Sequence, residues 1–186
     1  MRKLNKRRML AELLTMTAVI ALAGAATASA AVWRDGGAEV TSPFTLELAG
    51  GGQYEIEEGL GGVNCSEHMT LSSTGGSNAT ISKFENKSCR AFGTLSSCTV
   101  QTVEAIGLPW SIALGAEAET ITGMHVKHKF KAGCAVGEIN ETVNVAMTPN
   151  SPTAIESFEL FEAGGEYRQF GSYEIEGTNS GTYGIG

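Results

Sequence analysis

The fold class is decided by one stretch of the sequence, His68-Met-Thr-Leu-Ser-Ser-Thr-Gly-Gly-Ser-Asn-Ala-Thr-Ile-Ser-Lys-Phe-Glu85. Its two ends, His68–Ser73 and Ala79–Glu85, alternate apolar and polar residues, which is the two-residue period of a strand with one buried face. The residues between them, Thr-Gly-Gly-Ser-Asn at 74–78, are turn formers. The stretch is therefore predicted to be an antiparallel β-hairpin.

Similar alternating segments lie on both sides of this hairpin. Phe44–Leu48 and Tyr54–Glu57 alternate around Gly50-Gly51-Gly52, which predicts an earlier hairpin that turns at the three glycines. Further strands are expected at 99–106, 111–114, 120–131, 139–147, 158–160 and 173–175, with a break at Leu108-Pro109-Trp110. Past residue 30 no stretch has the 3.6-residue period of a helix. The fold is therefore predicted to be all-β, either an antiparallel sandwich or an open barrel built from hairpins.

The cysteines extend this prediction to covalent structure, and they are Cys65, Cys89, Cys98 and Cys134. An even number in an exported chain indicates two disulfides, with three possible connectivities. The first two cysteines are centred inside the Thr74–Asn78 turn, and the last two inside a turn expected at 115–118. We therefore predict the bonds Cys65–Cys89 and Cys98–Cys134. A zinc site is the alternative, but no C-x-x-C pair or His–Cys cluster has ligand spacing, so neither metal nor cofactor is predicted.

The first thirty residues have the pattern of a secretory signal peptide. Five basic residues precede residue 9, residues 13–25 are largely apolar, and Ala28-Ser-Ala30 provides a small-x-small cleavage site. Glu12 interrupts the apolar run and leaves an uncleaved anchor as the alternative, although 13–25 is shorter than the roughly 20 apolar residues that span a bilayer. We expect cleavage near Ala30 and a single secreted or cell-surface domain over 31–186, with no membrane span in the mature chain.

The charge of the chain limits its partners. The formal net charge is −7, and it becomes −11 without the leader, whose five basic residues and one acid carry +4. Such an acidic surface repels nucleic acid, because nucleic-acid binding depends on neutralising phosphates. An extracellular glycan or protein is the expected partner class.

One strand carries a basic stripe. His125-x-x-His128 has the spacing of a helical metal motif, but the segment alternates as a strand, so residues three apart point to opposite faces. The residues that share the outer face are His125, Lys127, Lys129 and Lys131. The stripe is a candidate contact for an anion or another ligand, and the alternative is a solvated strand face whose lysines prevent aggregation.

No catalytic set is apparent in the sequence. After the leader there is a single aspartate, Asp35, and neither a G-x-S-x-G nor an H-E-x-x-H motif occurs. We therefore predict a non-catalytic domain with a binding or structural role at the cell surface or in the medium. One alternative is a glycan hydrolase that uses two of the many glutamates. The other is a secreted enzyme inhibitor, with Pro149–Pro152 as its projecting loop.

Several short motifs carry a resemblance to known proteins, namely Trp33 with Asp35-Gly36, Val63-Asn64-Cys65, Phe84–Cys89 and the run from Cys98-Thr-Val100 to Leu108-Pro109-Trp110. In these motifs the chain resembles uncharacterised small secreted all-β proteins of soil actinobacteria. The resemblance implies a disulfide-bonded, secreted all-β module. It transfers no activity and no site residue.

Overall fold

The computed structural model describes residues 31–56, 61–115, 119–164 and 167–186. The predicted signal peptide lies outside these residues. The elements are β1 (Trp33–Asp35), β2 (Ala38–Glu39), β3 (Phe44–Ile56), β4 (Gly61–Gly75), β5 (Asn78–Gly93), β6 (Val100–Ala105), β7 (Trp110–Ala113), β8 (Glu119–Phe130), β9 (Glu138–Pro149), β10 (Ser157–Gly164), β11 (Tyr167–Ile175), the 3-10 turn η1 (Gly177–Asn179) and β12 (Tyr183–Ile185). Within the described ranges, no helix is long and apolar enough to cross a bilayer.

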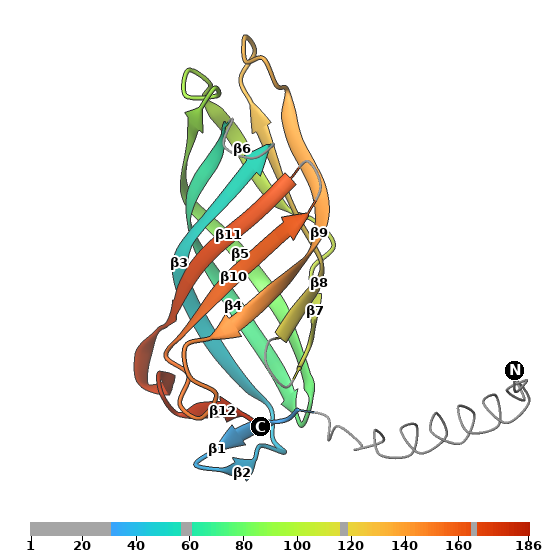
Figure 1. The fold of residues 1–186 in the computed structure, drawn as a ribbon, viewed down its shortest axis with the longest axis vertical. Coiled ribbons are helices and arrows are strands. Elements are labelled where there is room, and N and C mark those ends of the chain that lie inside the picture. Colours follow the sequence, from blue (N-terminus) through green and yellow to red (C-terminus); the bar gives the residue numbers. More distant parts are fainter. Residues whose placement is uncertain (1–30, 57–60, 116–118, 165–166) are drawn as a thin grey trace, which may run out of the picture.

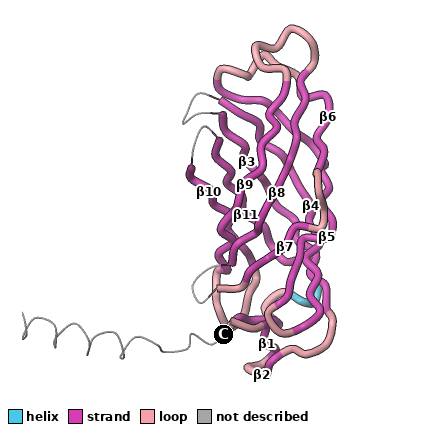
Figure 2. The backbone as a smooth tube through the Cα atoms, turned by 90° about the vertical axis from the view of Figure 1, so that its right-hand side faces the viewer, coloured by secondary structure: helices cyan, strands magenta, loops and turns pink. Residues whose placement is uncertain are grey.

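The long strands form a closed antiparallel barrel of eight positions (Figures 1 and 2). Closure depends on β9, which pairs with β8 on one side and with β10 on the other, for example through Met124↔Val143 and Leu160↔Met147. The predicted sandwich or open barrel is therefore wrong, although the all-β class is confirmed. Both architectures bury one face of each strand with the same two-residue period, so the sequence pattern does not distinguish them.

One barrel position is shared by two short strands. β6 pairs with the C-terminal half of β8 and β7 with its N-terminal half, and β7 in turn pairs with β5. The predicted break at Leu108-Pro109-Trp110 separates the two strands, as expected for a proline that cannot donate to a ladder.

The two predicted N-terminal hairpins have opposite outcomes. β4 and β5 form the hairpin predicted from residues 68–85, and their ladder extends from the turn out to Gly61↔Gly93. The hairpin predicted at Gly50-Gly51-Gly52 is wrong, because these glycines lie inside the continuous strand β3. β3 stays paired with β4 along its whole length and with β11 from Leu48 to Ile56, so both of its edges are paired at the glycines. At Gly50 and Gly52 the missing side chains leave room for residues inside the barrel, and no turn forms.

The hydrophobic core fills the barrel interior. Alternate residues of each strand point inward, and they include Leu46, Leu48, Met69, Leu71, Ile81, Ile121, Met124, Val145, Met147, Phe158 and Leu160. A small sheet of β12, β1 and β2 covers one end of the barrel, at the bottom of Figure 1. There the fully buried Trp33 packs edge-on against Phe44, whose ring stacks on Tyr183.

Both predicted disulfides are confirmed. Cys65 and Cys89 occupy directly opposite positions on β4 and β5, and Cys98–Cys134 joins the β5–β6 connection to the β8–β9 connection. The bonded cysteines are separated by 24 and 36 residues. On the chain-entropy model, loops of this size stabilise the fold by about 3.5 and 4 kcal/mol.

Candidate functional site

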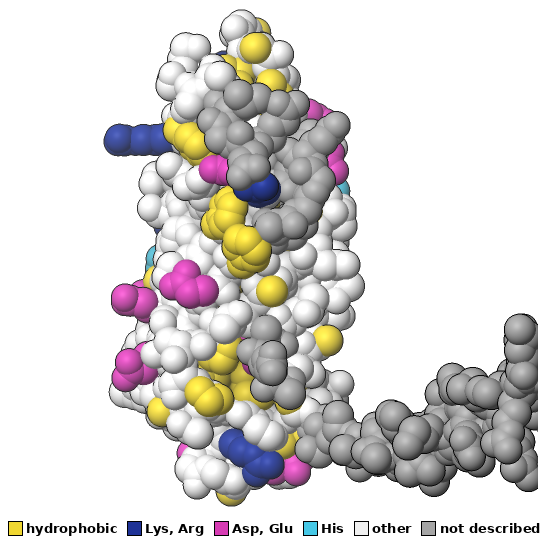
Figure 3. All heavy atoms as spheres, in the orientation of Figure 1, with side chains coloured by type: hydrophobic (Ala, Val, Ile, Leu, Met, Phe, Trp, Pro, Cys, Tyr) yellow, Lys and Arg dark blue, Asp and Glu magenta, His cyan; other side chains and the backbone are white. Residues whose placement is uncertain are grey.

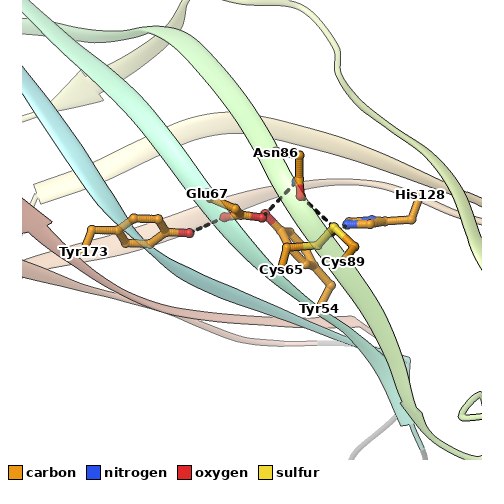
Figure 4. The surroundings of a disulfide bond; sticks show 7 residues. All are labelled: Tyr54, Cys65, Glu67, Asn86, Cys89, His128 and Tyr173. Carbon is orange, nitrogen blue, oxygen red and sulfur yellow. Dashed lines mark hydrogen bonds between the residues drawn. A yellow bond between two sulfur atoms is a disulfide. The ribbon is translucent and has the colours of Figure 1, made fainter.

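A polar row crosses the barrel interior (Figure 4). Asn86 on β5, Glu67 on β4, Gly50 on β3 and Tyr173 on β11 are consecutive partners in the ladders of four neighbouring strands. The Glu67 side chain is fully buried. Tyr173 donates a hydrogen bond of 2.5 Å to Glu67 Oε2, and Tyr54 donates one of 2.8 Å to Oε1. The amide of Asn86 donates a third bond to Oε1 at 3.3 Å.

Burial and hydrogen bonding act in opposite directions on the Glu67 carboxyl. Burial raises its pKa to about 7, whereas the hydrogen bonds from Tyr173, Tyr54 and Asn86 lower it. Burial also raises the pKa of both tyrosines well above the ordinary value, and the neighbouring Glu67 charge adds to this rise. The tyrosines therefore remain hydrogen-bond donors, and the carboxyl titrates near neutral pH.

Glycines make the space for this row. A Cβ at Gly50 would collide with the Ser172 carbonyl and lie 2.8 Å from the Tyr173 ring. A Cβ at Gly52 would lie 2.5 Å from Glu67 Oε2, and one at Gly171 would collide with the Tyr173 ring. The inward-facing glycines of β3 and β11 are therefore required by the side chains that lie over them.

His128 lies beside the interior disulfide. Its ring is fully buried, with Nε2 3.8 Å from Cys65 Sγ and with its centroid 4.4 Å from that of Tyr54. Burial lowers the pKa of His128 to about 4, so the ring is neutral at physiological pH. Cys65, Cys89 and His128 offer ligand atoms within 4.8 Å of one another, but both sulfurs are bonded to each other, and a metal would need their thiolates.

A hollow of about 470 Å³ lies on the outer wall of β4, β3, β11 and β10. Its floor is the backbone of one inward-facing row, formed in ladder order by Cys65, Gly52, Gly171 and Leu160. On one side lies an outward-facing row of Asn64, Gln53, Phe170 and Phe161. On the other side Gly51 has no side chain, and Glu159 completes the rim. Of the glycines that line the hollow, Gly51 faces outward, and its missing side chain lowers the outer surface at this point.

Phe161 and Phe170 form the apolar wall of the hollow. They are direct ladder partners on β10 and β11, and their ring centroids are 5.4 Å apart. Phe161 is 52 % exposed, whereas Ile106, the other large hydrophobic residue exposed in the described chain, is 37 % exposed. Hydrophobic side chains gather on the face that β10 and β11 form (Figure 3). An aromatic pair with one exposed ring beside a concave floor is typical of a binding site for an apolar group.

Residues 6–157 match the family model described as "Alkane oxidation protein activator PraA/PraB-like". The chain belongs to the PraA/PraB-like family. This PraA/PraB-like chain has no match among curated proteins and none among solved structures.

The predicted basic stripe of the PraA/PraB-like chain lies on the outer face of β8. His125 contacts Asn140 Oδ1 at 2.7 Å, and Lys127 forms a salt bridge of 3.0 Å with Glu138. Lys129 follows on the same face, and Lys131 is exposed just after the strand ends. None of the stripe residues is among the described residues that line the hollow, and β9 separates β8 from β10. Its role as a ligand contact stays a prediction.

Sequence reasoning missed both Glu67 and the Phe161–Phe170 pair. In the alternating pattern of β4, Glu67 lies on the same buried face as Cys65 and Met69. An acidic residue at a position that the pattern assigns to the interior was the available signal. The aromatic pair gave no comparable signal, because its outward orientation follows only from the pairing of β10 with β11. The loop from Pro149 to Pro152 connects β9 to β10 and supplies no residue to either site.

Proposed function

We propose that the chain is a secreted, non-catalytic binding protein that holds an alkyl chain on its outer wall and thereby supports alkane oxidation. The observation that carries the proposal is the half-exposed ring of Phe161 beside the glycine floor of the hollow. Burial of an exposed aromatic ring against an alkyl chain is favourable because it removes apolar surface from water.

Family membership supports the proposal, because the family description names an activator of alkane oxidation. The volume of the hollow lies within the range of about 300–1,000 Å³ that is usual for small-molecule sites. A non-catalytic role is supported by the state of Glu67, a fully buried acid whose two oxygens already accept hydrogen bonds from Tyr54, Tyr173 and Asn86.

The binding proposal is tested by displacing the neutral fluorescent probe 1-aminoanthracene with dodecane. Phe161→Ser should weaken dodecane binding about tenfold, since it removes most of the apolar wall. Ile106→Ser is the matched control, because it removes the other large hydrophobic side chain exposed in the described chain, at a position outside the hollow, and it should leave binding unchanged. Equal affinity in the wild type and in folded Phe161→Ser protein would overturn the proposal.

Export from the cell is part of the same proposal, and so is the resemblance to secreted actinobacterial proteins, which implies export. Two disulfides support it, because such bonds persist in oxidising compartments. The test is the intact mass of protein produced by its own host, before and after reduction with alkylation. A chain that begins at Ala31 and yields four thiols only after reduction would support export. A retained leader or free thiols in the native protein would contradict it.

A further inference from the structure

We propose that the hollow selects long-chain primary alcohols over both alkanes and fatty-acid anions. This inference rests on the proposed function, because it assigns a headgroup preference to the same site. The apolar wall of Phe161 and Phe170 would hold the alkyl chain, and the polar residues of the rim would hold the hydroxyl.

The polar groups lie within the same outward-facing row as the aromatic pair. Gln53 is the ladder partner of Phe170, and Asn64 is the partner of Gln53 on the next strand. Gln53 Nε2 donates a hydrogen bond of 2.6 Å to Glu55 Oε1, which fixes the amide at the edge of the hollow. A primary amide has both acceptor and donor atoms, and one such bond leaves several of them for a ligand hydroxyl. An alkane offers nothing to these groups, so an alcohol gains hydrogen bonds that the hydrocarbon lacks.

A carboxylate lies on the opposite rim. Ser172 donates a hydrogen bond of 2.7 Å to Glu159 Oε1, which orients the side chain on the surface of β10. Its second oxygen is an acceptor for an alcohol O–H, and charge-assisted hydrogen bonds of this kind are about twice as strong as neutral ones.

The carboxylate of Glu159 disfavours an anionic headgroup at its side of the hollow. Glu159 lies on the rim and Glu55 beside Gln53, and the cations near them are Arg168, the ladder partner of Glu55, and Arg90, the ladder partner of Asn64. The whole chain is acidic as well, with a formal net charge of −7. A fatty-acid carboxylate at the Glu159 rim would therefore be repelled by that carboxylate and by the overall negative charge of the chain, whereas a neutral alcohol would not be. Primary alcohols are the product class of oxygen insertion into a terminal C–H bond of an alkane, which agrees with the family description.

The inference is tested with three ligands of one chain length. Dodecane, dodecan-1-ol and dodecanoate are each titrated against bound 1-aminoanthracene at pH 8. We expect the alcohol to bind at least fivefold more tightly than the alkane and at least tenfold more tightly than dodecanoate. Glu159→Gln should strengthen dodecanoate binding severalfold. Glu174→Gln is the matched control, because it removes an equal charge from the outer face of β11 outside the hollow and should not alter the preference.

The outcomes separate the two proposals. Equal affinities for alcohol and alkane, both weakened by Phe161→Ser, would overturn the headgroup preference and leave alkyl binding in place. Dodecanoate binding as tight as that of the alcohol in the wild type would also overturn the preference. Displacement that is insensitive to Phe161→Ser, or absent for every ligand, would overturn both proposals. Circular dichroism of each variant establishes that the barrel is folded.

Discussion

Tyr173 donates a hydrogen bond to Glu67 across the ladder position of Gly50. The two residues lie on β11 and β4, and β3 runs between them. The bond forms because Gly50 has no side chain in the space that the tyrosine ring occupies. One glycine in the middle of a strand therefore permits a buried carboxyl to be satisfied by a residue 106 positions away in the chain.

Substitution of this glycine should be destabilising. In Gly50→Ala the new Cβ would collide with the Ser172 carbonyl and press on the Tyr173 ring, both of which are held by the barrel. Overpacking of this kind costs about 1–3 kcal/mol, which urea unfolding would measure. Gly51→Ala is the control, since its Cβ points outward and has its nearest neighbour at 3.4 Å. Equal stability of the two variants would refute a packing role for Gly50.

The stability of the wild type should fall, relative to Glu67→Gln, as the pH rises. The pKa of Glu67 is raised by burial from 4.5 to about 7, so the folded state binds more protons than the unfolded state between these values. The relative free energy of unfolding starts to fall near pH 4.5, and above pH 7 the total decrease is about 3 kcal/mol. Thermal unfolding at pH 5 and pH 8 checks it. The raised pKa of buried Glu119 is common to both proteins and cancels in the comparison.

Parallel pH profiles of wild type and Glu67→Gln would mean that burial does not shift this carboxyl. A profile with the opposite slope would mean that the hydrogen bonds from the two tyrosines and Asn86 outweigh desolvation.

His128 should have the reverse pH dependence. Burial lowers its pKa from 6.5 to about 4, so the unfolded state binds more protons within this window. The wild type should therefore lose stability relative to His128→Phe as the pH falls from about 6.5 to 4. Phenylalanine retains a ring against Tyr54 and cannot titrate. Urea unfolding at pH 7 and pH 4 measures the difference, and a constant difference at both pH values would contradict a buried neutral imidazole.

Each disulfide should contribute to stability independently. Removal of either bond by paired Cys→Ala substitution should cost about 2–4 kcal/mol, because the unfolded chain regains the entropy of an open loop. Urea midpoints of the Cys65/Cys89 and Cys98/Cys134 double variants, compared with the oxidised wild type, provide the test. A midpoint unchanged within error for either pair would show that its bond does not constrain the unfolded state.

Much of the local structure is predictable from the sequence because it depends on neighbouring residues. The alternation around Thr74–Asn78 identifies the β4–β5 hairpin, and the position of Cys65 and Cys89 about its turn identifies their bond. Pro109 lies in the break between β6 and β7 for the same local reason, since its missing N–H cannot join a ladder.

Other features were decided only by the tertiary structure. The same glycines that favour a turn in an isolated segment lie within β3, because Glu67 and Tyr173 occupy the space above them. Barrel closure has a similar origin, since pairs such as Leu48↔Ile175 join residues more than 120 positions apart and leave no mark on either segment. A period of two residues determines which side chains share a face. Which strands meet, and therefore whether that face lines a closed barrel with a glycine-floored hollow on its wall, depends on non-local pairing of the whole chain.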